Sequence, residues 1–157
     1  MATVLVRAKK QWYRGWQTVT FLELAARDST EDGVGDIFDV GDWDNMVVIL
    51  DIDASLTDAG DTLDVKLDGS WDGTIFYNMG EFTQRAGNAG APAAEMMQFR
   101  KGGVVADEDA LLVLTADAGV TVVRPSMCPP YLRVTSAIAR VTGVDESHTF
   151  SVIAYIQ

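Results

Sequence analysis

The chain has 157 residues, of which 48% are hydrophobic and 22% are charged, and its formal net charge at pH 7 is −11. This length and composition are typical of a single globular domain and exclude a disordered chain. The negative charge excludes general binding to nucleic acid, because a phosphate backbone repels an acidic surface.

The elements predicted for the first part of the chain are strands, because apolar and polar residues alternate with a period of two. The first predicted strand covers residues 3–8, where apolar and polar residues alternate. Residues 18–24 follow and are apolar on both faces, which predicts a strand covered on both sides. The acidic, glycine-containing stretch 26–45 is typical of a loop, and a short strand at 37–40 interrupts it.

The same alternation predicts strands through the rest of the chain, at 46–54, 62–68, 95–100, 110–115, 120–124, 131–141 and 148–156. Asp72-Gly73 is a tight-turn signal and makes 62–79 a hairpin. Helix is limited to single turns at 25–27 and 106–111. Many short strands with frequent turn signals predict an all-β fold, specifically a single antiparallel β-sandwich, jelly-roll-like, with an N-terminal arm.

The predicted arm, residues 1–16, is basic and aromatic, whereas the sandwich domain, residues 17–157, is acidic. Residues 1–22 carry four basic and no acidic side chains, and the rest of the chain carries 8 basic and 23 acidic ones. Trp12, Tyr13 and Trp16 lie within five residues, and aromatic residues and arginine are favoured anchors of protein interfaces. The residues predicted to bind a partner are Arg7, Lys9, Lys10, Trp12, Tyr13, Arg14 and Trp16.

Two alternatives remain open for this segment. Its charges are solvated and its aromatic side chains pack back on their own sandwich, or the segment reaches an acidic surface on another subunit. Both hold at once if the segment is exchanged between copies of the chain.

No residue pattern predicts catalysis or a cofactor. His148 is the only histidine, and Cys128 has no charged neighbour in the sequence that would activate its thiol. Asp51 and Asp53 resemble the start of a calcium loop. However, Leu56 stands where the loop needs glycine, so we interpret the two aspartates as outward residues of a strand and predict no metal ligands. A pair of catalytic carboxylates among the 23 acids is left open, but the sequence singles none out.

The single cysteine and the absence of a basic segment before an apolar run predict a protein made in a reducing cytoplasm without a signal peptide. No apolar run approaches the roughly 20 residues of a membrane-spanning helix, so we expect no membrane contact.

From residue 35 to residue 156 the sequence resembles a family of tailed-phage virion proteins, the small β-sandwich proteins encoded near the major capsid protein. The resemblance is carried, in order, by residues 37–41, 47–53, 62–67, 70–74 (Ser-Trp-Asp-Gly-Thr), 82–84, a glycine-rich loop, 131–134, 141–143 and 149–152. It covers about three quarters of the chain. The sequence departs from the family in placing Trp71 before the turn and in its basic aromatic N-terminal segment.

The resemblance implies a capsid decoration or cement protein without catalytic residues. Such a protein binds the outer face of the mature head and bridges subunits of the major capsid protein. The expected setting is the capsid surface of a virion assembled in the cytoplasm of a bacterial host, and we expect a homo-oligomer, either a trimer or a dimer. The alternatives are a virion-borne carbohydrate-binding or adhesion module that uses Trp43 and Trp71, and a tail or connector component.

Overall fold

The computed structural model describes residues 5–7, 11–13, 15–28, 33–56, 60–87, 92–101, 128–140 and 147–157. In these ranges the chain forms strands and no helix. The strands are β1 (Leu5–Arg7), β2 (Gln11–Tyr13), β3 (Trp16–Arg27), β4 (Gly33–Val34), β5 (Ile37–Asp39), β6 (Asn45–Leu56), β7 (Thr62–Ser70), β8 (Tyr77–Glu81), β9 (Arg85–Ala86), β10 (Ala93–Arg100), β11 (Tyr131–Ala139) and β12 (Ser147–Ile156).

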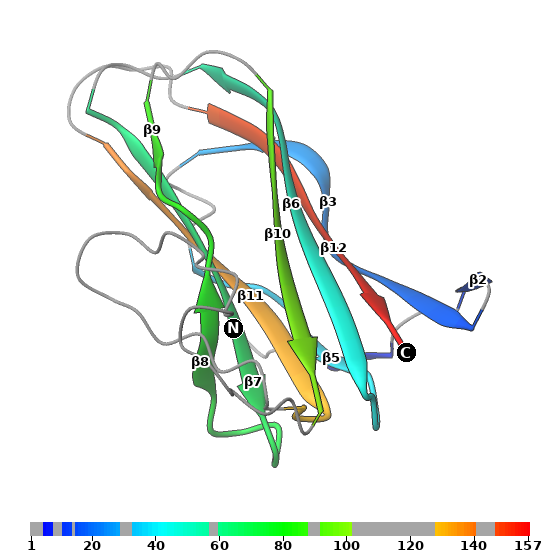
Figure 1. The fold of residues 1–157 in the computed structure, drawn as a ribbon. Coiled ribbons are helices and arrows are strands. Elements are labelled where there is room, and N and C mark those ends of the chain that lie inside the picture. The colour runs from blue at the N-terminus through cyan, green and yellow to red at the C-terminus, as the bar shows by residue number, and fades with distance from the viewer. Residues whose placement is uncertain are drawn as a thin grey trace, which may run out of the picture.

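The strands form two sheets, which Figure 1 shows side by side. The seven-stranded sheet has the order β1-β5-β11-β7-β8, with β4 also paired to β11 and β9 to β7. The five-stranded sheet has the order β10-β6-β12-β3-β2. Every pairing is antiparallel except that of β1 with β5, which is parallel. The all-β prediction is therefore confirmed for the described residues, in a sandwich-like arrangement.

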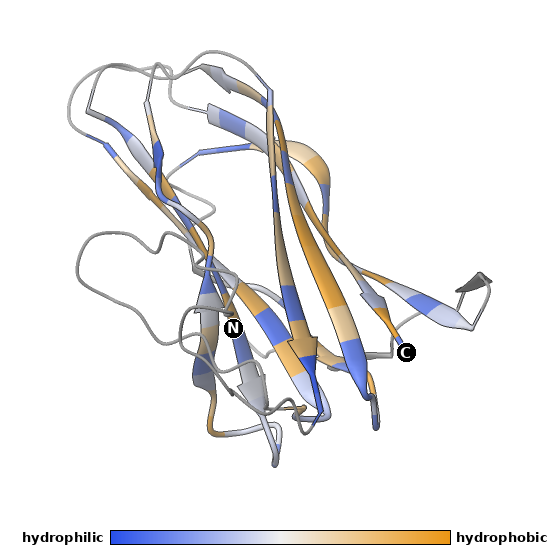
Figure 2. Cartoon of the chain, in the orientation of Figure 1, coloured by the Kyte–Doolittle hydropathy of each residue, from blue (hydrophilic) through white to orange (hydrophobic). Residues whose placement is uncertain are grey.

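Both sheets contribute alternate side chains to one hydrophobic core. Along β7 the buried residues are Leu63, Val65 and Leu67, and the polar residues between them are half-buried, as the period-two pattern predicts. Figure 2 shows the same alternation of hydrophobic and hydrophilic residues along the strands. The rings of Phe21 in β3 and Phe38 in β5 meet edge to face at 5.1 Å and so join the two sheets.

The structure corrects two predictions for β3. Residues 25–27 are the end of the strand rather than a helical turn, because Arg27 and Ala26 pair with His148 and Thr149 of β12. The predicted cover on both faces is wrong for the end of the strand, although Leu22 is partly buried and packs against the core. Val19 and Phe21 are buried, whereas Leu24 is exposed, because its part of the strand lies outside the sandwich core.

Other predictions differ in extent or lie outside the described residues. The strand expected at 131–141 ends at Ala139, and the short strands β2, β4 and β9 were not anticipated. The strands predicted at 110–115 and 120–124 and the helical turn at 106–111 fall outside the described part of the chain.

Candidate functional site

The turn between β7 and β8 is built by the side chains of Ser70 and Asp72. The Ser70 hydroxyl accepts hydrogen bonds from the backbone N–H groups of Asp72 and Gly73 at 3.3 and 2.9 Å and donates to Asp72 Oδ1 at 2.9 Å. The same carboxylate oxygen accepts from the backbone N–H groups of Thr74 at 2.8 Å and Ile75 at 2.9 Å. These bonds, led by the one from Ile75, lower the pKa of Asp72. With Gly73 at a φ of 71°, they fix the turn in one conformation.

This fixed turn presents large apolar side chains to solvent. Trp71 is 60% exposed, Ile75 57% and Tyr77 51%. Exposed apolar side chains that gather on one part of a surface are typical of a site that contacts another molecule. Residues 71–77 are therefore a candidate contact region.

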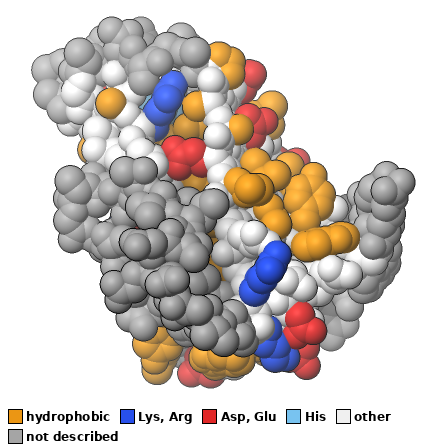
Figure 3. All heavy atoms as spheres, viewed as in Figure 1, with side chains coloured by type: hydrophobic (Ala, Val, Ile, Leu, Met, Phe, Trp, Pro, Cys, Tyr) orange, Lys and Arg blue, Asp and Glu red, His pale blue; other side chains and the backbone are white. Residues whose placement is uncertain are grey.

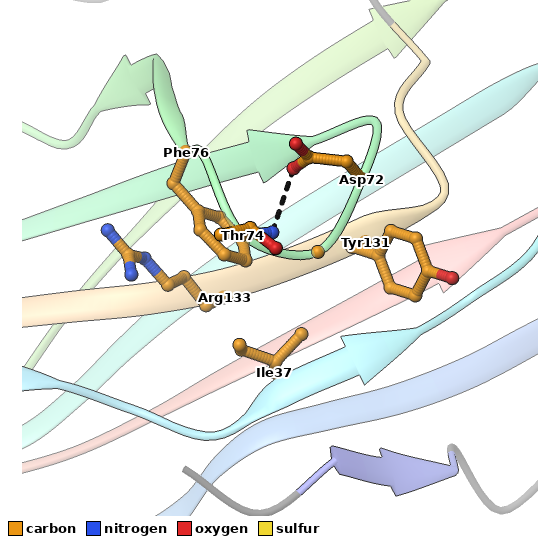
Figure 4. A pocket seen from close by; sticks show the side chains of 7 residues that line it. Ile37, Asp72, Thr74, Phe76, Tyr131 and Arg133 are labelled. Carbon is orange, nitrogen blue, oxygen red and sulfur yellow. Dashed lines mark hydrogen bonds between the residues drawn. The ribbon is translucent and has the colours of Figure 1, made fainter.

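A pocket of about 490 Å³ lies between this turn and strands β5 and β11. The residues that line it, shown in Figure 4, are Ile37, Asp72, Gly73, Thr74, Phe76, Tyr131 and Arg133. We call it the turn pocket. The register that brings its walls together pairs Tyr131 with Ser70, so the first residue of β11 lies beside the start of the turn.

Arg133 is held in place on one side of the turn pocket. Its Nε donates to Asp68 Oδ2 at 3.1 Å, and the hydroxyl of Thr135 donates to the same oxygen at 3.1 Å. Its guanidinium carbon lies 4.0 Å from the centre of the Phe76 ring, a cation–π distance. Arg133 and Phe76 therefore fix each other, because a side chain held by two partners loses most of its rotamer freedom.

A second candidate surface is the outer face of the five-stranded sheet. The register aligns Met96, Ile49 and Ile153 in one row across β10, β6 and β12, and Tyr155 lies opposite Val47 one step along the strands. Met96 is 48% exposed and Tyr155 40%, and the others are half-buried. We call these five residues the apolar face. Figure 3 shows hydrophobic side chains gathered on the side of the molecule where β6 and β12 lie.

The structure divides the predicted partner-binding residues between the two sheets. The backbone of Arg7 belongs to β1, at an edge of the seven-stranded sheet, and those of Trp12 and Tyr13 belong to β2, at an edge of the other sheet. Trp16 is half-buried and begins β3, opposite Tyr13. The predicted residues that lie outside the described part of the chain are Lys9, Lys10 and Arg14.

Trp43 does not serve as an exposed sugar platform, which corrects one expectation from the sequence. Its side chain is buried, and its indole N–H donates to the carbonyl oxygen of Pro129 at 2.9 Å. The hydrogen bond joins the segment before β6 to the segment before β11, so the role of Trp43 is structural.

His148 and Cys128 are both buried. His148 Nδ1 lies 3.0 Å from the hydroxyl oxygen of Ser55. Burial lowers the pKa of His148; nearby Asp61 opposes this change and Arg85 adds to it. Burial likewise raises the pKa of the Cys128 thiol. Neither side chain lines the turn pocket.

Among the described residues, no three side chains of the His, Cys, Asp or Glu type lie close enough together to hold a metal ion. Asp51 and Asp53 are exposed residues of β6, as the strand interpretation expects. The same part of the chain contains no helix long and apolar enough to cross a membrane.

The turn pocket was not identified from the sequence. The Asp72-Gly73 signal predicted its turn, but Phe76, Tyr131 and Arg133 were not singled out. Only the alternation of residues 131–134 hinted that Tyr131 and Arg133 share the face opposite the core. Comparisons with protein families, with curated proteins and with solved structures found no match.

Proposed function

We propose that the chain is a capsid decoration, or cement, protein of a tailed phage. It binds the outer face of the mature head as a dimer or trimer and bridges subunits of the major capsid protein. The observation that carries the proposal is the apolar face, a group of large apolar side chains on the outer side of a sheet, of which Met96 and Tyr155 are exposed. Contiguous apolar surface on a soluble domain is typical of a protein–protein interface.

The finer fold that we propose is a jelly roll, and the strand order supports it. Leaving out β1, β2, β4 and β9, the two sheets have the orders β3-β12-β6-β10 and β5-β11-β7-β8. The chain passes from one sheet to the other at every step between these strands except from β7 to β8. Eight strands wound between two sheets are the arrangement of jelly rolls, which occur in viral capsid proteins and in lectins. A fold hosts many functions, so the surface of the protein supports the proposed function more directly than the fold does.

The N-terminal segment extends the proposed capsid contact. β2 pairs with β3, and β3 lies beside β12, the strand that carries Tyr155. The part of the segment from residue 11 onwards therefore joins the sheet that bears the apolar face. In this proposal Trp12, Arg14 and Trp16 are anchors, and Lys9 and Lys10 steer the protein towards an acidic surface. That residues 1–16 act as an arm that contacts the capsid is part of this proposal.

Decoration stabilises a capsid by mass action. A protein that binds only the mature lattice lowers the free energy of the closed shell and leaves that of the separated subunits unchanged. An oligomer that touches several capsid subunits adds multivalency, because each further contact forms at a high effective concentration.

The test is co-sedimentation of the purified chain with expanded capsids assembled from the major capsid protein of the same phage. The double variant Met96→Lys/Tyr155→Lys places two charges on the apolar face. We expect at least about tenfold weaker binding, since interface anchors contribute about 2 kcal/mol or more each. The matched control is Ala139→Lys, which places a charge on an exposed apolar residue of β11 in the other sheet and should leave binding unchanged.

The N-terminal segment is tested separately with Lys9→Glu/Lys10→Glu, whose binding should be weaker at low salt and approach that of the parent at high salt. The proposal is overturned if the parent chain does not co-sediment, or if the variants on the apolar face and in the N-terminal segment all bind like the parent. Native mass spectrometry gives the oligomeric state, and a large ring or tube would favour a tail or connector component instead.

A further inference from the structure

We infer that the turn pocket is a binding site for a neutral pyranose sugar, such as a residue of a cell-surface glycan. The site lies on the outer face of the seven-stranded sheet and uses no residue of the apolar face. The inference is therefore independent of capsid binding. It deepens the sequence-based alternative of a carbohydrate-binding module by assigning it a place and a set of residues.

The apolar walls of the turn pocket are fixed before any ligand binds. Gly73 lies so close above Tyr131 that a Cβ atom added to Gly73 would be 3.6 Å from three ring carbons. Phe76 is held by the guanidinium group of Arg133 at 4.0 Å. Ile37 completes the apolar part of the lining. Fixed aromatic and aliphatic walls suit the C–H face of a pyranose ring and cost little conformational entropy on binding.

Polar groups at the rim supply both donors and acceptors. The Oδ1 atom of Asp72 accepts the hydrogen bonds that build the turn, and no described residue donates a hydrogen bond to its Oδ2 atom. The Nε atom of Arg133 donates its hydrogen bond to Asp68, and none of the described residues accepts a hydrogen bond from the two terminal nitrogens of Arg133. The Thr74 hydroxyl can both donate and accept a hydrogen bond. Neighbouring hydroxyl groups of a sugar donate and accept at once, so a carboxylate oxygen and a guanidinium group on one rim match them.

The charge of the site favours a neutral ligand over an acidic one. The positive charge of Arg133 is offset by Asp68 at 3.1 Å, and Asp72 adds a second carboxylate to the lining. The chain as a whole carries a net charge of −11. A sialic or uronic acid would therefore meet a negative potential, whereas an uncharged hexose or N-acetylhexosamine would not.

The size of the pocket agrees with this class of ligand. Its volume of about 490 Å³ falls within the range of small-ligand sites, about 300–1,000 Å³. Trp71 precedes Asp72 on the fixed turn and is largely exposed, so it can add a second stacking surface for the next sugar of an oligosaccharide.

The experiment is saturation-transfer-difference NMR on the full chain. The probes are a panel of neutral sugars (glucose, galactose, mannose, N-acetylglucosamine and their short oligomers) and an acidic panel of sialic and glucuronic acid. We expect millimolar binding of at least one neutral probe. Thr74→Val should weaken it severalfold, and Trp71→Ala should weaken the binding of the short oligomers severalfold. Together the two changes should weaken oligomer binding about tenfold, a change of about 1.4 kcal/mol. Both side chains are exposed, so neither change should unfold the protein.

The control is Tyr155→Ala, which removes an exposed aromatic ring from the other sheet and should leave sugar binding unchanged. Three results overturn the inference: no neutral sugar binds the parent chain, only the acidic probes bind, or binding survives Trp71→Ala/Thr74→Val unaltered. Loss of sugar binding with intact capsid binding supports two separate sites.

Discussion

Gly69 is a residue whose substitution tests how closely β7 packs against its buried neighbours. It lies buried in β7, opposite Leu132 of β11 and Tyr77 of β8. A Cβ atom added there would overlap the Met79 sulfur and the Pro129 ring and would lie 3.2 Å from Met79 Cγ. Both neighbours are buried, so neither can move into solvent. We therefore expect Gly69→Ala to lower the free energy of unfolding by about 1–3 kcal/mol, the usual cost of overpacking a core.

The assay is urea denaturation followed by tryptophan fluorescence, together with a thermal melt. For a chain of this size each kcal/mol lost lowers Tm by about 2–4 °C. A double-mutant cycle with Met79→Ala is the control. Removing the Met79 side chain relieves part of the overlap, so the cost of Gly69→Ala should fall by about 0.5 kcal/mol or more in that background. A Gly69→Ala protein as stable as the parent would refute the steric argument, because it would mean that β7 and Pro129 separate freely.

Three further predictions concern buried polar groups. Trp43→Phe leaves the Pro129 carbonyl without its donor and should cost about 1–3 kcal/mol of stability, measured by urea denaturation; an unchanged midpoint would contradict the buried hydrogen bond. Because burial lowers the pKa of His148 in the folded chain, stability should be constant above about pH 6.5 and decrease as pH falls below the unfolded-state pKa. A His148→Gln variant should lack that part of the pH dependence in denaturation curves recorded from pH 7.5 to 5, and an identical pH profile would argue against it. Because burial raises the pKa of Cys128, iodoacetamide should alkylate the folded chain far more slowly than the chain in urea, as followed by mass spectrometry; equal rates would mean that the thiol is accessible.

The period-two pattern predicted the strands well where one side of the strand faces the core. The strand expected at 62–68 is observed as Thr62–Ser70, and the one expected at 148–156 as Ser147–Ile156. Where both faces are apolar the pattern carries no such information. This is why it misjudged the cover over Leu24. The helical turn predicted at 25–27 was wrong because pairing with β12 holds that segment extended.

The turn pocket could not be predicted from the sequence, because its walls come from distant parts of the chain. The chemistry of the turn is local, and the Asp72-Gly73 signal predicted it correctly. Tyr131 and Arg133 reach the same place only through the register of β11 on β7, which pairs Tyr131 with Ser70 and Arg133 with Asp68. Alternation within a strand fixes which face a residue occupies, but it does not fix which strand lies beside it.

The two proposed surfaces lie on different sheets, and this makes their independence a testable consequence of the fold. The turn pocket is built on β5, β11 and the turn after β7, whereas the apolar face is built on β10, β6 and β12, and the core lies between the sheets. Substitutions that share no partner residues have additive effects. A chain carrying both Trp71→Ala and Met96→Lys/Tyr155→Lys should therefore lose sugar binding and capsid binding each to the extent seen in the separate variants. A larger combined loss would mean that the sheets transmit strain across the core, and the two surfaces would then have to be treated as one site.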